Sequence, residues 1–131
     1  MNSDKPISPA KPAAPRLKFV LLVAAEDATR HAAKWTLTHF GYLVDVTRSA
    51  EEALTLFDAT LHDVVVTADA IPGITGVELA HIIKLRSPRT PVVLLARRAA
   101  PADRSCLDSV VERSARLWGL ADVVQRLVAD V

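Results

Sequence analysis

The chain has few of the residues that mark specialised classes of protein. Its 131 residues include one cysteine, four glycines and only 5% aromatic residues. A single thiol excludes an internal disulfide framework and a cysteine-rich zinc site, and it is compatible with a reducing cytoplasm. The sequence places no histidine beside Cys106, so we interpret this residue as part of the packing rather than as a nucleophile.

Neither sign of charge dominates. Sixteen basic and fifteen acidic residues leave a formal net charge of +1. We therefore expect no binding to nucleic acid and none to a membrane surface. No apolar run approaches the length of a transmembrane helix, which favours a cytoplasmic location. The four histidines share no metal-ligand spacing, and we expect neither a metal nor another cofactor.

Proline is concentrated at the beginning of the chain. Pro6, Pro9, Pro12 and Pro15 stand among alanine, lysine and serine, with no apolar period. This composition predicts a disordered tail over residues 1–16 and one domain over residues 17–131. A secretory leader is the rival interpretation, but the apolar run that follows Lys18 is short and the segment before it is long and proline-rich.

From residue 17 onward, short apolar runs alternate with helical periodicity. The pattern predicts strands near residues 19–23, 44–47, 64–67, 92–95 and 110–111. Helices are expected between them, with Asp27 or Thr29, Ser49 and Thr75 as N-terminal caps. Five strands alternating with helices predict an α/β fold, a doubly wound, flavodoxin-like parallel sheet of order 2-1-3-4-5. Residues 97–108 leave room for only a shortened or irregular fourth helix.

Four segments keep an order and spacing that resemble one known family. They are Val20-Leu21-Leu22-Val23, Gly41-Tyr42, Glu51-Glu52-Ala53-Leu54 and the run from Pro72 to Leu79. Together they resemble the receiver domain of bacterial response regulators over nearly all of residues 17–128. The resemblance implies a reaction site at the carboxyl ends of the strands. That site contains an acidic pair for magnesium, an aspartate that accepts a phosphoryl group, a hydroxyl residue and a lysine.

The positions that correspond to the carboxylates of the family carry alanine. Ala24 and Ala25 stand at the acidic pair, and only Glu26 offers an oxygen ligand nearby. Ala68 stands at the nucleophile position and has no nucleophilic atom. Asp69 lies one residue further, where the alternation of strand side chains is expected to turn its carboxylate away unless a bulge restores its direction.

The other positions of the reaction also depart from the family pattern. Ala96 corresponds to the hydroxyl residue, and Glu112, or Arg113 if the strand is shifted by one residue, corresponds to the lysine. Ser109 corresponds to the aromatic residue that reports phosphorylation in many receivers. The resemblance therefore implies a scaffold without a metal site, without catalytic residues and without the conformational readout.

Three further residues are candidates for contacts. Arg97 and Arg98 follow the fourth strand, where they either form an ion pair with Glu26 and Asp69 or remain exposed on a loop. Trp118 precedes the final helix, and we consider an exposed interaction anchor and a buried position equally.

We predict a non-enzymatic, non-phosphorylatable pseudo-receiver that acts as a protein-protein interaction module in two-component signalling. No output domain follows Val131 in the sequence, so the expected partner is a histidine kinase, another receiver or a separate output domain. A homodimer is also open. The alternatives are an atypical receiver that is phosphorylated on Asp69 and a small flavodoxin-like ligand-binding domain.

Overall fold

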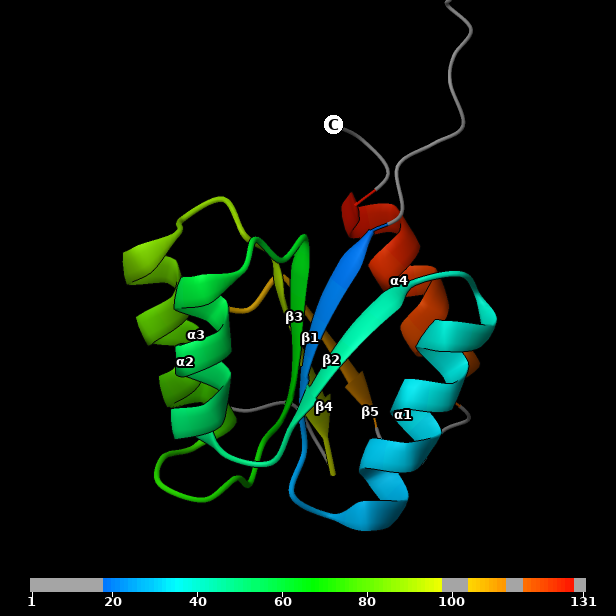
Figure 1. Cartoon of the computed structure of the whole chain (residues 1–131), viewed down its shortest axis with the longest axis horizontal. Coiled ribbons are helices and arrows are strands. Elements are labelled where there is room, and N and C mark those ends of the chain that lie inside the picture. The colour runs from blue at the N-terminus through cyan, green and yellow to red at the C-terminus, as the bar shows by residue number, and fades with distance from the viewer. Residues whose placement is uncertain (1–17, 98–103, 113–116, 129–131) are drawn as a thin grey trace, which may run out of the picture.

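A computed structural model describes residues 18–97, 104–112 and 117–128 of the chain. Five strands and four helices alternate over most of this length (Figure 1). In chain order the elements are β1 Phe19–Val23, α1 Asp27–His39, β2 Leu43–Thr47, α2 Ala50–Ala59, β3 Val64–Ala68, α3 Gly76–Arg86, β4 Val92–Ala96, β5 Ser109–Glu112 and α4 Trp118–Val128.

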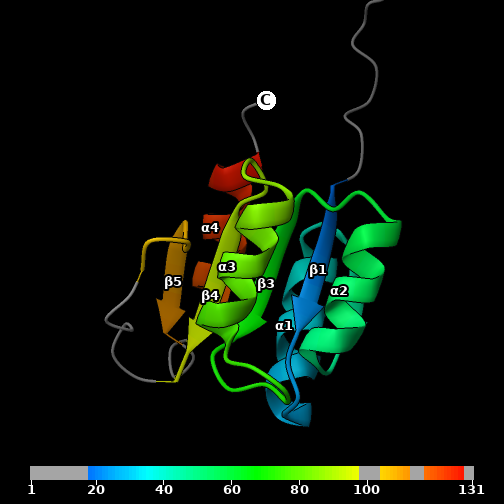
Figure 2. The same ribbon diagram turned by 90° about the vertical axis from the view of Figure 1, so that its left-hand side faces the viewer.

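The strands form one parallel sheet in the order β2-β1-β3-β4-β5. Helices α1 and α4 cover one face of the sheet, and α2 and α3 cover the other (Figures 1 and 2). The predicted α/β class, strand order and double winding are confirmed. In such a sheet the chain reverses its winding between β1 and β3, so ligands bind at the carboxyl ends of these two strands.

Alternate residues of each central strand supply two separate cores. Leu22, Val66 and Leu95 belong to the cluster that packs against α1 and α4. Leu21 and Val65 belong to the cluster that packs against α2 and α3. All five side chains are fully buried, because helices cover both faces of a parallel sheet and leave no face for water.

Helix ends follow the sequence signals in most places. Thr75 and Glu78 form a complete capping box at the start of α3. Gly41 follows α1 with a φ of 95°, a left-handed conformation that ends a helix without a Cβ penalty. The expected cap of α1 is wrong, because Glu26 takes the N-cap position and Asp27 is the first helical residue. The carboxylate of Asp27 instead accepts a hydrogen bond from Arg30.

The connection between β4 and β5 is described only in part. A shortened or irregular helix is predicted within residues 97–108. The described residues 104–108 contain a turn and no helix, and residues 98–103 lie outside the described residues. Strand β5 is longer than predicted and runs from Ser109 to Glu112. Helix α4 begins at Trp118 itself, although the sequence predicts that this residue precedes the final helix. Within the described part of the chain, no helix combines the length and the apolarity needed to cross a bilayer.

Candidate functional site

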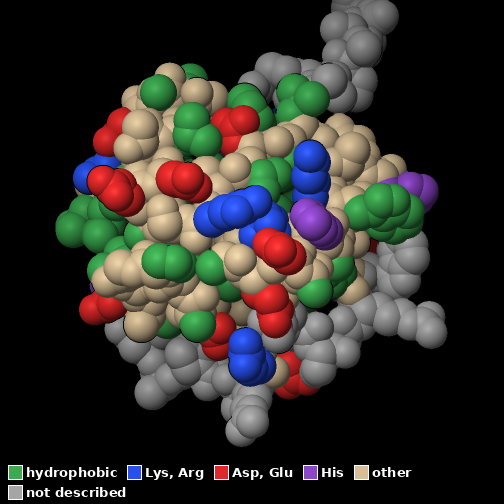
Figure 3. All heavy atoms as spheres, turned by 60° about the horizontal axis from the view of Figure 1, so that its bottom comes forward, with side chains coloured by type: hydrophobic (Ala, Val, Ile, Leu, Met, Phe, Trp, Pro, Cys, Tyr) green, Lys and Arg blue, Asp and Glu red, His purple; other side chains and the backbone are tan. Residues whose placement is uncertain are grey.

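The predicted reaction positions lie along one edge of the sheet. Backbone register pairs Val23 with both Thr47 and Thr67, so β1, β2 and β3 end at the same level. Ala96 at the end of β4 pairs with Glu112 at the end of β5. This carboxyl edge faces the viewer in Figure 3, where acidic and basic side chains gather over it. The structure thus places the strand ends that carry the predicted reaction positions at one edge of the sheet.

Methyl groups occupy the centre of this edge. Ala24, Ala68 and Ala96 are all buried and offer no side-chain oxygen or nitrogen. Glu26 is exposed, and its carboxylate accepts a hydrogen bond from the Thr29 hydroxyl. Within the described residues, no three histidine, cysteine, aspartate or glutamate side chains are grouped closely enough to hold a metal ion.

A buried arginine is attached to the β1–α1 loop. Arg30 is only 3% exposed, and its Nη1 donates to the carbonyl oxygens of Ala24 at 3.2 Å and Ala25 at 3.1 Å. Its Nη2 donates to the carboxylate of Asp27. The guanidinium therefore neutralises one carboxylate and supplies hydrogen-bond donors to the backbone of Ala24 and Ala25, the two positions at which the resemblance predicts an acidic pair.

Sequence reasoning missed Arg30, although a periodic signal for it exists. Arg30, Ala33 and Leu37 follow the helical spacing i, i+3, i+7 and share the buried face of α1. An arginine on an apolar helix stripe is rarely buried without partners, so its position predicts a nearby set of acceptors. Only the structure shows that backbone carbonyls provide two of them.

The contact between Arg30 and Asp27 predicts that the stability of the fold depends on pH. The hydrogen bond and the charge of Arg30 hold the pKa of the exposed Asp27 carboxyl below its usual value of 3.8. A lowered native pKa stabilises the fold above the unfolded value, and this contribution is lost as the pH falls through the native value. NMR titration is expected to give a native pKa below 3.8. As the pH falls below about 4, the free energy of unfolding of Asp27→Asn, measured in urea, is expected to fall less than that of the wild type.

Asp69 contacts the end of β4 through a backbone group. Its Oδ2 accepts a hydrogen bond from the backbone N–H of Arg97 at 3.4 Å, and its own carbonyl accepts from the N–H of Gly76 at 2.8 Å. The Arg97 guanidinium and Asp69, both described, do not form an ion pair, and Arg97 is exposed, which is the other alternative for this residue. Arg98 lies outside the described residues.

The remaining predicted positions lie on the edge strand β5 and at the start of α4, away from the centre of the carboxyl edge. Glu112 is exposed at the end of the edge strand β5, and Ser109 at its beginning is half-buried. Trp118 is the first residue of α4, and its side chain is outside the described part of the structure. The prediction of Trp118 as an interaction anchor therefore stays a prediction.

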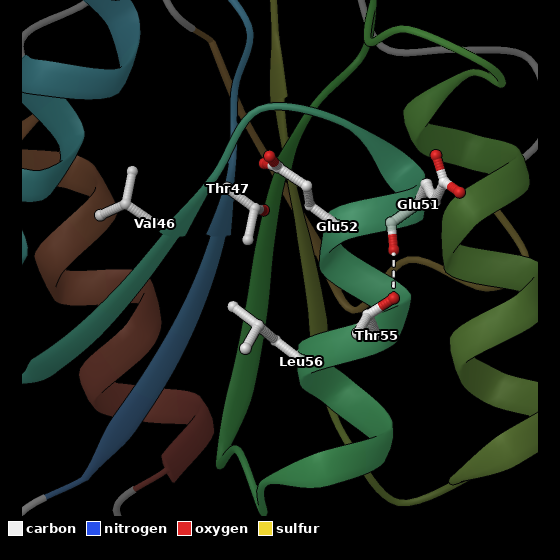
Figure 4. Close-up of a pocket in the computed structure, with 6 residues that line it drawn as sticks. All are labelled: Val46, Thr47, Glu51, Glu52, Thr55 and Leu56. Atoms are coloured by element: carbon white, nitrogen blue, oxygen red, sulfur yellow. Dashed lines mark hydrogen bonds between the residues drawn. The ribbon is translucent and has the colours of Figure 1, made fainter.

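A surface cavity of about 490 Å³ lies beside the carboxyl edge, between β2 and α2 (Figure 4). Glu52 and Leu56 extend from α2 toward β2, whereas the carboxylate of Glu51 points away from that strand. Glu52 accepts a hydrogen bond from the backbone N–H of Arg48, the residue before the N-cap Ser49 of α2. Its carboxylate thus has a structural role, and the cavity lies away from the β1–β3 switch point.

The structure corrects one expectation about Cys106. Its Sγ lies 3.3 Å from Nδ1 of His81 on α3, although the two residues are 25 positions apart. Cys106 is half-buried and packs against the core beneath α2 and α3. A histidine does stand beside the thiol, because the turn at residues 104–108 folds back over α3. Sequence spacing could not reveal this contact.

The strand order and the candidate site at the carboxyl edge define a doubly wound, flavodoxin-like domain. Residues 20–109 match the family model described as the response regulator receiver domain. The chain belongs to this receiver domain family.

Several known proteins share this similarity. The transcriptional regulatory protein AfsQ1 of Streptomyces coelicolor is 34% identical over 79 residues, which are 60% of this chain and 35% of that protein. TrcR of Mycobacterium tuberculosis is 32% identical over 85 residues, 65% of this chain and 33% of that protein. The chain thus spans about a third of the length of these curated relatives.

Solved structures give the same assignment. The response regulator TrrA of Thermotoga maritima, crystallised with Mg²⁺ and BeF, has a TM-score of 0.79 and 28% identity. The match covers 85% of this chain and 99% of that one. A chain in the complex of the histidine kinase ThkA with TrrA has a TM-score of 0.78 at 28% identity, and the match covers 86% of this chain and 99% of that one.

Proposed function

We propose that this chain is a cytoplasmic receiver-like module that does not accept a phosphoryl group and that acts by binding another protein. Phosphoryl transfer to a receiver needs a nucleophilic oxygen and a cation that neutralises the charge on the phosphoryl group. Ala68 provides no oxygen at the nucleophile position. The proposed function therefore depends on the surface of the domain rather than on a reaction.

The single observation that carries the proposal is the position of Arg30. Its guanidinium donates to the carbonyls of Ala24 and Ala25, where the family resemblance places the magnesium ligands. The guanidinium already uses these two carbonyl oxygens as acceptors, and the alanine side chains offer a divalent cation no oxygen. Arg30 also gives the loop donors that hold it in place without a metal.

The proposed partner is a protein of the same signalling class. The TrrA receiver is found in complex with the histidine kinase ThkA, and the curated relatives are transcriptional regulators. We therefore propose a histidine kinase, another receiver or a separate output domain as the partner, with a homodimer as a special case of the second. Binding is expected to be independent of magnesium and of phosphodonors.

Phosphorylation on Asp69 is the second candidate. Asp69 directly follows β3 at the carboxyl edge of the sheet, where the reaction site of the family is expected, and this favours the candidate. Against it, the carboxylate accepts a hydrogen bond from the backbone of Arg97, and no acidic pair accompanies it. We rank it below the non-phosphorylatable function for these reasons.

Paramagnetic Mn²⁺ tests the metal half of the proposal, because a bound ion broadens nearby amide signals. We expect the signals of residues 24–26 and 68–69 in the wild type to broaden no more than those of other exposed acidic loops. The matched variant combines Ala24→Asp, Ala25→Asp, Ala68→Asp and Arg30→Met, and selective broadening at this edge is expected to return in it. Selective, saturable broadening in the wild type would reject the proposal.

A further inference from the structure

An exposed aromatic surface lies at the other edge of the sheet, away from the candidate site. Trp35, Phe40 and Leu43 are 58%, 49% and 48% exposed, which is high for large apolar side chains. The ring of Trp35 stacks on that of His39 at 4.9 Å and an interplanar angle of 8°, and His39 meets Phe40 edge to face at 5.2 Å. We call Trp35, His39, Phe40 and Leu43 the aromatic surface.

The described chain begins beside this surface. The backbone N–H of Leu43 donates to the carbonyl oxygen of Lys18 at 2.9 Å, and Phe19 is the register partner of Leu43. Residues 1–17 are therefore connected to the fold at a point that touches the aromatic surface. A segment attached this closely has a high effective concentration at the surface.

The attached segment carries a pattern that aromatic surfaces recognise. Pro6, Pro9, Pro12 and Pro15 are spaced three residues apart. A polyproline II helix has three residues per turn, so prolines at this spacing share one face when the segment adopts that conformation. Such a face docks on flat aromatic rings, and it loses little conformational entropy when it does so.

The lengths also match. At about 3.1 Å per residue, Pro15 lies ~9 Å and Pro12 ~19 Å from Lys18 along a polyproline II helix. Pro12 and Pro15 are thus ~9 Å apart. Along α1, the five residues from Phe40 to Trp35 span ~7.5 Å. One turn of prolines is therefore the right length to reach from the Phe40–Leu43 end of the surface to the Trp35 ring.

We propose that the aromatic surface is a polyproline-binding site and that the segment around Pro12 and Pro15 of the same chain occupies it. Contact is intramolecular and involves mainly the two prolines nearest the fold. The proposal is independent of the phosphoryl chemistry, because it concerns the opposite edge of the sheet.

The test compares two double variants of the full chain by NMR. Pro12→Ala with Pro15→Ala removes the two contacting rings, and Pro6→Ala with Pro9→Ala is the matched control with the same composition. We expect the first variant to shift the Trp35 indole signal and the amide signals of Phe40 and Leu43, and the control to leave them unchanged. The indole signal is assigned with Trp35→Phe.

The wild type supplies the direct readout. We expect nuclear Overhauser contacts between the Trp35 ring protons and Pro12 or Pro15 that do not change on dilution. Equal shifts in the two variants, or the absence of these contacts, would overturn the proposal. Contacts that weaken on dilution would also overturn it, because they would assign the surface to the segment of a second copy.

Discussion

Replacing Gly76 with alanine is expected to destabilise the domain by about 3 kcal/mol or more, the upper end of the range for overpacking. A Cβ at this position would lie 2.2 Å from the carbonyl oxygen of Ala68 and 2.9 Å from Cδ1 of Leu94. The nearer atom belongs to the backbone of a central strand and cannot move aside without breaking the sheet. Urea unfolding followed by circular dichroism measures the change.

Gly119 in α4 is the matched control for Gly76. It is also helical, but a Cβ there meets nothing within 4 Å. Gly119→Ala is expected to be neutral or to stabilise the fold by up to about 1 kcal/mol, because alanine has the higher helix propensity. Equal effects of the two substitutions would contradict the close approach of α3 to the end of β3.

Replacing Arg30 with methionine is expected to destabilise the domain by about 3 kcal/mol. Methionine fills much of the volume of the arginine stem, so the change mainly removes hydrogen bonds. The carbonyls of Ala24 and Ala25 then lose their donors, and the one at Ala24 belongs to a fully buried residue. The pairing with Asp27 adds little to this figure, because that carboxylate is 76% exposed.

Arg86 provides the comparison for Arg30. It forms an ion pair of 2.6 Å with Asp58, but both side chains are exposed. Arg86→Met is expected to change the free energy of unfolding by less than about 1 kcal/mol. If Arg30→Met has an effect as small as this, the guanidinium does not hold the β1–α1 loop, and the main support for the proposed function is lost.

The architecture was predictable because its signals are local and repeated. The continuous apolar runs at 19–23 and 92–95 have the length of strands covered on both faces, and Thr75 with Gly41 marked helix ends correctly. The cap of α1 was not predictable from residue preference alone. Asp27 is a good capping residue, but its carboxylate is drawn to Arg30, so the preceding Glu26 takes the cap position.

The candidate site was only half predictable. The family pattern located Ala24, Ala68 and Ala96 at one edge of the sheet, because parallel strands end together. It gave no information about Arg30, whose partners are backbone carbonyls that carry no sequence signature. The approach of His81 to Cys106 was missed for a similar reason, since a turn between distant residues creates it.

The central claim is that this receiver-like domain does not take up a phosphoryl group. The most direct measurement is the intact mass of the wild-type chain after incubation with a small-molecule phosphodonor and Mg²⁺, beside a receiver that retains its aspartate as a positive control. We predict that the control gains one phosphoryl group and that this chain gains none. A gain in the wild type that disappears in Asp69→Asn would contradict the account and identify Asp69 as the acceptor.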